Sequence, residues 1–277
     1  MKKIIFSLLL ISFCSLQAFC DEENFRTLFF EAFSNRDVEA QKSILTKWEK
    51  EDAGNAELYA AYFNYYSDLY RAEVFKTQDR NSTKAVELMK NGMDWINKGI
   101  EQYPDRLDFR FGKIFMFSET EEFDKFTDEI IKTLEQSSAI DNKWTWANNT
   151  VIDKTPKKFM LTAIQEYQIR LYNTEQYDDM KRISETVLKY YPDHIESMSN
   201  LSIVFMVQKQ YDKAVEVLLK AKKIAPKDII ILSNTAHAYK LNNDSKNAIK
   251  YYKQVVKYGN AAEKHQAKQQ IEELQKK

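Results

Sequence analysis

The sequence predicts an all-α chain in which short antiparallel helix pairs repeat and stack on one another. The 277 residues include only five glycines and four prolines, whereas a fold with many tight strand turns needs more of both. Apolar residues recur at helical spacing. Marker residues return after a step of 34 residues, since Tyr177 and Pro192 are followed by Tyr211 and Pro226. A fixed period of this length is typical of a helical repeat.

Residues 1–20 have the composition of a secretory signal peptide. A positively charged start precedes an apolar run, Ile4–Phe13, that is too short to span a bilayer, since a spanning helix needs about 20 residues. Small residues suited to cleavage follow, with a cut expected after Ala18 or after Cys20. The Lys-, Asn- and Ile-rich usage indicates a bacterial source. We therefore expect an exported protein that is periplasmic, held in the cell envelope or secreted.

An alternative makes Cys20 the lipid-bearing first residue of a lipoprotein. The acidic run at 21–23 favours this assignment, whereas Phe19 is bulkier than the residue that such a signal prefers. The chain would then be a lipid-anchored assembly factor at the outer membrane or elsewhere in the envelope. No later apolar run approaches the length of a spanning helix, so membrane contact is expected only through that lipid.

Residues 21–137 are expected to form three degenerate helix pairs. In the second pair, Gly92 and Gly99 are seven residues apart, which would let its two helices approach closely. About ten extra residues, from Glu73 to Thr83, separate these helices. The helices of the three pairs are expected over 23–34 and 37–52, over 55–72 and a helix that ends at Pro104, and over 107–118 and 121–137.

Residues 138–160 interrupt the repeat. Trp144 and Trp146 lie two residues apart, and two asparagines and Pro156 follow, so the helical spacing is lost. We expect an irregular connecting segment between two stacks of helices. A less favoured interpretation places an enzyme site near residues 144–156, which would require a pocket with two facing carboxylates.

Residues 161–262 are expected to form three regular units, followed by a capping helix over 263–277. In the middle unit, Ala214 and Ala221 are small enough for two helices to approach closely, and Pro226 ends the second helix. The polar tail carries a thin apolar stripe that would cover the open face of the last pair. One pair buries too little apolar surface to offset the cost of ordering its residues, so we expect stability only from stacked neighbours.

The 34-residue step resembles the tetratricopeptide repeat family over residues 161–260. Tyr177 and Tyr211 open successive second helices, as the family pattern requires, although Met180 and Ser245 depart from it. The resemblance implies a right-handed α-solenoid of antiparallel helix pairs with a C-terminal capping helix. It also implies that the first helices of the units line a concave groove that binds a peptide or a protein partner.

Carried over to this chain, the resemblance implies a set of groove-facing side chains on three successive first helices. They are Gln165, Ile169, Tyr172, Ser199, Asn200, Ile203, Met206, Ser233, Asn234, His237 and Lys240. Asn200 and Asn234 recur one step apart, and their amides can either hydrogen-bond an extended peptide or bond within the solenoid. Few cations occur in this set, so we do not expect it to clamp a C-terminal carboxylate of a chaperone tail.

The remaining sequence offers little support for catalysis. Lys+Arg and Asp+Glu number 41 each, which argues against nucleic acid as the main partner. The histidines lack ligand partners at metal-binding spacing, His194 with Glu196 being only a weak pair, and the glycines form no phosphate loop. We therefore expect no catalytic residue, metal or cofactor, and a scaffold that binds a protein or peptide.

Overall fold

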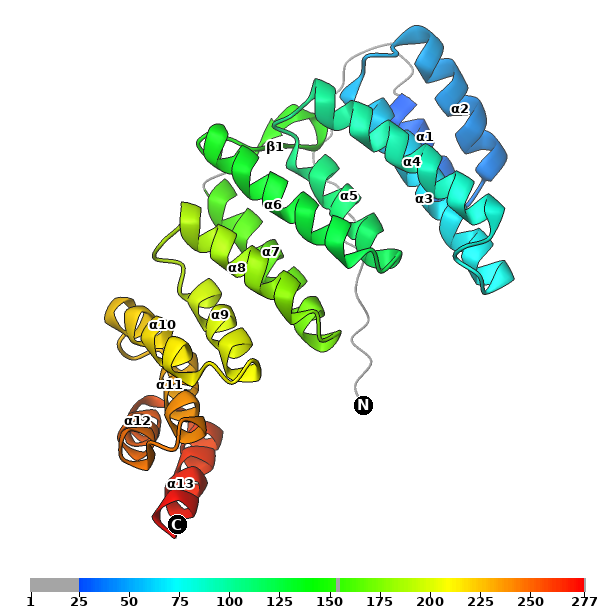
Figure 1. Ribbon diagram of the computed structural model, residues 1–277. Helices are drawn as coiled ribbons and strands as arrows, with labels where there is room; N and C mark the ends of the chain where they lie inside the picture. The colour runs from blue at the N-terminus through cyan, green and yellow to red at the C-terminus, as the bar shows by residue number, and fades with distance from the viewer. Residues whose placement is uncertain (1–24, 153–154, 277) are drawn as a thin grey trace. The chain divides into compact units, whose positions relative to one another are not determined.

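The computed structural model describes residues 25–152 and 155–276, which are almost entirely helical (Figure 1). The predicted signal peptide and Cys20 lie outside the described residues. Over the described ranges there are thirteen α-helices and one antiparallel sheet of two-residue strands. No helix in those ranges is both long and apolar enough to cross a membrane. The chain divides into two compact units, Met1–Ala53 and Gly54–Lys277.

The first unit contains one described helix pair, α1 (Phe25–Ser34) and α2 (Val38–Glu51). Asp37 caps α2, because its Oδ1 accepts a hydrogen bond from the Ala40 amide at 3.0 Å. Phe29 is fully buried, and the Phe25 ring stacks on Trp48 with centroids 5.9 Å apart. Aromatic burial therefore joins the two helices of this pair.

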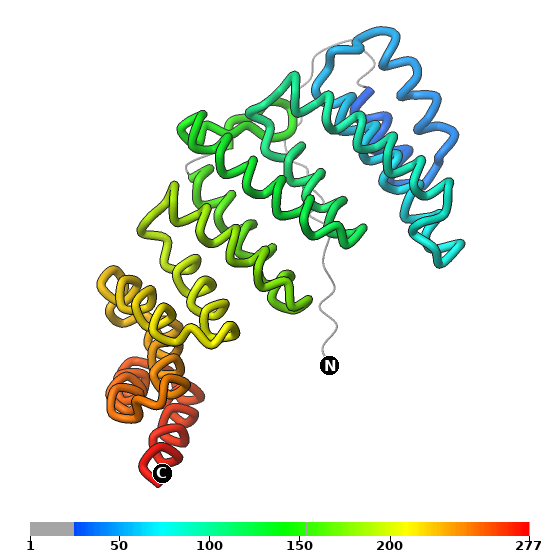
Figure 2. The backbone as a smooth tube through the Cα atoms, viewed as in Figure 1, coloured from blue at the N-terminus to red at the C-terminus, as the bar shows by residue number. Residues whose placement is uncertain are grey.

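The second unit is an all-α helical-repeat solenoid, as predicted. Its helices alternate in direction from one to the next, and the tube in Figure 2 follows their helix–turn–helix path. The elements are α3 (Ala56–Thr77), α4 (Thr83–Gln102), α5 (Leu107–Glu119), α6 (Phe123–Ala139), β1 (Thr145–Trp146), the 3-10 turn η1 (Ala147–Asn149), β2 (Thr150–Val151), α7 (Pro156–Asn173), α8 (Tyr177–Tyr190), α9 (Ile195–Val207), α10 (Tyr211–Ile224), α11 (Ile229–Leu241), α12 (Ser245–Tyr258) and α13 (Ala261–Gln275).

Two helices depart from the predicted bounds by more than the one or two residues by which other helix ends differ. Helix α3 continues to Thr77, where 55–72 was expected, so much of the predicted insertion is helical. Gln78 then ends the helix with a φ of 54°. Helix α7 begins at Pro156, inside the segment expected to be irregular. Proline suits the first turn of a helix, because its missing N–H has no partner there in any case.

The turns between the two helices of a pair share one backbone conformation. Glu175, Lys209 and Asn243 have φ angles of 60°, 59° and 59°, and they are separated by the same 34-residue step. This left-handed conformation costs a residue with a side chain about 1–2 kcal/mol. The repeat is therefore present in the backbone even where the residue types differ.

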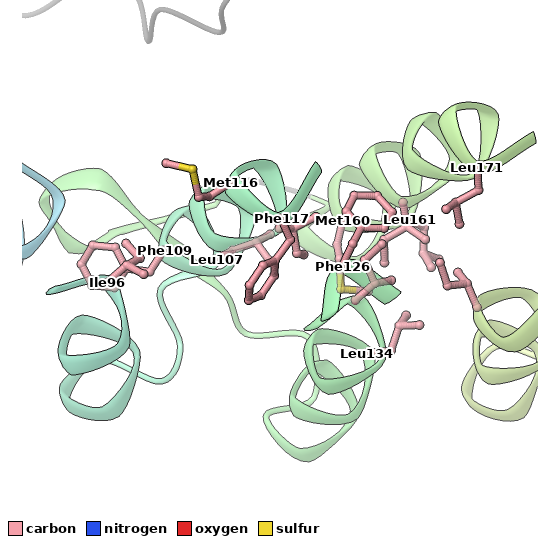
Figure 3. Close-up of a cluster of buried hydrophobic side chains, with 14 of the residues drawn as sticks. Ile96, Leu107, Phe109, Met116, Phe117, Phe126, Leu134, Met160, Leu161 and Leu171 are labelled. Atoms are coloured by element: carbon pink, nitrogen blue, oxygen red, sulfur yellow. The ribbon is translucent and has the colours of Figure 1, made fainter. Parts of the chain in front are cut away.

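The core of the second unit lies between successive helices. One apolar cluster runs without a break from α3 to α9, and Figure 3 shows part of it, including Ile96, Phe109 and Phe126. Two further clusters join α9 to α11 and α11 to α13. In the last of these, Ala267 and Leu274 of α13 lie in the same cluster as Tyr251 and Tyr252 of α12. Helix α13 therefore caps the last pair.

Small residues occupy the closest helix approaches. Ala214 and Ala221 of α10 have no exposed surface. In the α3–α4 pair, a Cβ atom at Gly99 would lie 3.1 Å from Tyr59 Cβ and 3.1 Å from Phe109 Cε2. These contacts explain why small residues recur at the predicted positions.

Gly99→Val is expected to lower the free energy of unfolding by about 1–3 kcal/mol, as overpacking of a dense core does. Urea unfolding followed by circular dichroism measures the change. Gly54→Val is the matched control, because nothing lies within 4 Å of the Cβ position at residue 54. Equal stability of the two variants would contradict a close approach of α3 and α4 at Gly99.

Candidate binding surface

The residues expected to line the groove lie on α7, α9 and α11, the first helices of three successive pairs. These predicted groove residues differ in solvent exposure. Ile169, Tyr172 and His237 are exposed, whereas Ser199 and Asn200 are buried. The half-buried members of the set are Gln165, Ile203, Met206, Ser233, Asn234 and Lys240. The exposed members are the ones that a partner could reach directly.

Polar side chains of this set link the three helices to one another. Asn200 Nδ2 donates to Gln165 Oε1 at 2.7 Å, and Gln165 Nε2 donates to Asn200 Oδ1 at 3.3 Å. One helix further on, Asn234 Nδ2 donates to Ser199 Oγ at 2.9 Å. Both asparagine amides therefore bond within the solenoid, which is one of the two alternatives that the sequence left open. An additional contact with a partner stays a prediction.

The remaining polar residues of α11 are placed differently. Lys240 Nζ lies 2.6 Å from Gln270 Oε1 and 3.2 Å from Glu273 Oε2 on α13, so its charge is already balanced. His237 is exposed, yet partial burial of its ring and the nearby Lys240 charge lower the pKa of His237. Near pH 7 the imidazole is therefore expected to be neutral, and α11 presents little charge to solvent.

Exposed apolar side chains mark the same three helices. The exposed fractions are 53% for Ile169, 46% for Tyr172, 46% for Val207 and 64% for Ile230. Together with half-buried Ile203 and Met206, these residues form what we call the first-helix face. Val207 and Ile230 were not among the predicted groove residues. The sequence does indicate them indirectly, because the helices that carry Val207 and Ile230 contain few charged residues.

In the last two pairs, the first and second helices contrast sharply in charge. Helices α9 and α11 contain one charged residue each, Glu196 and Lys240. Helices α10 and α12, of similar length, contain six and four. A solvent-accessible helix face with apolar, amide and hydroxyl groups but few charges is typical of a surface that another protein covers.

A buried arginine, Arg106, links the connecting segment to α3 and α5 through hydrogen bonds and ion pairs. The Arg106 side chain has no exposed surface; it binds both Asp108 carboxylate oxygens, at 2.8 and 2.7 Å, and Glu57 Oε1 at 2.8 Å. It also donates to Asn149 Oδ1 in the segment at 3.0 Å. Glu57 Oε1 in turn accepts from the Asn148 amide at 2.7 Å. Burial raises the pKa of Asp108, although Arg106 opposes this shift.

This network bears on the enzyme interpretation of residues 144–156. Two carboxylates do meet beside the segment, but both bind the same guanidinium. Trp144 is fully buried, and its Nε1 donates to Ser137 Oγ at 2.9 Å. The network and Trp144 thus hold the segment in place. They do not place two carboxylates opposite each other across a pocket.

His194 has a structural position at the start of α9. Its Nδ1 accepts a hydrogen bond from the Ser197 amide at 3.3 Å, so the imidazole caps the helix. Its Nε2 lies 3.4 Å from Glu196 Oε2. Burial lowers the pKa of His194, with the Glu196 charge opposing the shift. Among the described residues, no group of three or more His, Cys, Asp or Glu side chains could hold a metal ion.

Comparison with known proteins identifies the repeat. Residues 195–228 and 231–259 match the tetratricopeptide repeat family model, which confirms the predicted resemblance over those units. These two units are therefore similar to tetratricopeptide repeats, which is consistent with a protein–protein interaction scaffold. No curated protein matches the sequence.

Several solved structures are similar to this chain at low identity. YrrB, a tetratricopeptide repeat protein with an unusual peptide-binding site, is 13% identical with a TM-score of 0.45, covering 81% of this chain and 97% of its own. PilF of Pseudomonas aeruginosa is 14% identical with a TM-score of 0.39, covering 91% and 95%. A tetratricopeptide repeat protein from Parabacteroides merdae is 10% identical with a TM-score of 0.39, covering 92% of each chain.

Arg106→Met is expected to lower the free energy of unfolding by about 3–5 kcal/mol, because it leaves two largely buried carboxylates, Glu57 and Asp108, without their counter-charge. Urea unfolding followed by tryptophan fluorescence measures the loss. Arg80→Met is the matched control: Arg80 pairs with Glu121 at 3.0 Å, but both side chains are substantially exposed, and such pairs contribute about 0–1 kcal/mol. Similar losses in the two variants would refute a special role for Arg106.

Proposed function

We propose that the tetratricopeptide repeats of this chain form a non-catalytic scaffold whose first-helix face lines a groove for a peptide or protein partner. The observation that carries the proposal is the contrast between helices. The first helices α9 and α11 expose Val207 and Ile230 and carry one charged residue each, whereas α10 and α12 are rich in charge. Covering exposed apolar surface is favourable by about 25 cal/mol per Å².

The internal hydrogen bonds support this use of the surface. Because Asn200 bonds to Gln165 and Asn234 bonds to Ser199, α7, α9 and α11 are held to one another without help from a ligand. A surface that is ordered before binding loses less conformational freedom when it binds. The exposed apolar side chains are then presented on a preformed support.

Photo-crosslinking from single positions tests this function. A photoreactive amino acid at residue 169 or 207 is expected to cross-link a partner protein in cells of the source organism. The same amino acid at Lys253, exposed on the second helix α12, is the matched control and should yield little product. Cross-linking from residue 253 but from neither face position would disprove the assignment of the face.

We further propose that the chain works in the cell envelope, because residues 1–20 have the composition of a signal peptide. The mass of the protein purified from its source separates the two forms of this proposal. A mass lacking residues 1–18 or 1–20 without added lipid supports a released scaffold, whereas a diacylated Cys20 supports a lipid-anchored one. A chain that retains its first 20 residues would contradict export by this route.

A further inference from the structure

Two arginines on the first helices have no carboxylate partner in the described part of the chain. They are Arg71 of α3 and Arg170 of α7, and both are half-buried. The Nε atom of each is buried without a hydrogen-bond acceptor. Three other arginines with buried or partly buried partners, Arg106, Arg110 and Arg182, all form ion pairs. Arg71 and Arg170 therefore differ from the other arginines just named in having no ion pair within the described residues.

Both guanidinium groups lie beside the last two turns of α5. The Arg71 Cζ atom lies over the Phe115 ring, 5.8 Å from its centroid. On α7, Arg170 Nη2 donates to the Ser118 carbonyl at 2.7 Å. Phe115 and Ser118 are three residues apart and so lie on neighbouring turns of one helix side. One guanidinium from α3 and one from α7 thus flank the same end of α5.

Apolar side chains are exposed on α5 and α7, the helices that carry Ser118 and Arg170. Phe115 is 38% exposed, and Ile169, next to Arg170, is 53% exposed. Tyr172 follows on α7, with its ring in edge contact with Tyr177 at 6.1 Å between centroids. We call Arg71, Phe115, Ile169, Arg170 and Tyr172 the arginine strip. It continues the first-helix face from α7 toward α5 and α3.

Neither arginine of this strip forms an ion pair with a described carboxylate. A partly buried cation loses hydration, and a nearby anion normally restores the lost free energy. Carboxylates lie close by, at Asp68 on α3, Glu119 at the end of α5 and Glu166 on α7, but none of the three forms an ion pair with Arg71 or Arg170. Arg170 uses one of its N–H groups on the Ser118 carbonyl, and a guanidinium has five. Each arginine can therefore still bind a carboxylate, as its planar fork favours.

We propose that the partner of this scaffold binds through an acidic segment that also carries apolar side chains. Its side-chain carboxylates pair with Arg71 and Arg170, and its apolar side chains cover Phe115 and Ile169. This inference rests on the proposed function, and it extends the binding surface to α3 and α5. It specifies internal carboxylates of a polypeptide, so a free C-terminus is not required.

Three short labelled peptides, acetylated and amidated at their ends, test the charge preference against the full chain. One alternates Glu with Leu, one Lys with Leu, and one Glu with Ser. Fluorescence anisotropy is expected to show the tightest binding for the Glu–Leu peptide, with affinity falling as salt is added. The Lys–Leu peptide tests the need for acidic groups, and the Glu–Ser peptide tests the need for apolar ones.

Variants then locate the site. Arg71→Gln and Arg170→Gln are each expected to weaken the Glu–Leu peptide about tenfold, consistent with loss of a charge-assisted hydrogen bond. Arg170→Lys keeps the cation but loses the planar fork, so it should bind the Glu–Leu peptide more tightly than Arg170→Gln does and less tightly than the unmodified chain. Lys253→Gln, which removes an exposed charge on α12, should leave affinity unchanged. Thermal melting checks that each variant is folded.

The inference is overturned if the Glu–Leu peptide binds no tighter than the Lys–Leu peptide, if both arginine variants bind it like the unmodified chain, or if none of the peptides binds. Cross-linking from residue 207 on α9 is independent of these outcomes. A partner that cross-links there while the peptides show no acidic preference removes this inference and leaves the proposed function standing. If residue 207 gives no cross-link and the peptides show no acidic preference, both this inference and the proposed function are contradicted.

Discussion

Burial of apolar surface between neighbouring helix pairs is the interaction on which the second unit depends. Ordering each residue costs about 1–2 kcal/mol of backbone entropy, and a single pair has apolar surface on both of its sides. The cluster that runs without a break from α3 to α9 meets this cost, because each pair buries the open side of the next. Small residues such as Gly99 and Ala214 let the helices come close enough for that burial.

The connecting segment shows how a repeat can be interrupted without dividing its core. Trp144 takes the place of helix side chains in the apolar cluster, and Arg106 joins α3, α5 and Asn149 through charged groups. An ion network of this kind adds little net stability over apolar packing, but removing one of its members leaves the others without a counter-charge. The segment is thereby held against α3 and α5.

Much of this architecture could be predicted from the sequence, because the 34-residue step and the small residues at helix contacts are visible in residue types. The left-handed turns could not, since Glu175, Lys209 and Asn243 share a backbone angle and no chemistry. The candidate surface was predicted in part. Ile169 and Tyr172 are exposed as a binding role requires, but Asn200 is buried against Gln165. The unpaired state of Arg71 and Arg170 depends on three-dimensional neighbours, which spacing alone does not reveal.

The left-handed turns lie apart from the residues proposed to bind a partner, so stability and partner choice depend on different positions of the repeat. Glu175, Lys209 and Asn243 are exposed and lie outside both the first-helix face and the arginine strip. Their backbone strain persists because the packed helices on either side determine the path of the chain. Evolution can therefore adjust the heat resistance of such an array at its turns and its choice of partner on its first helices, with little interference between the two.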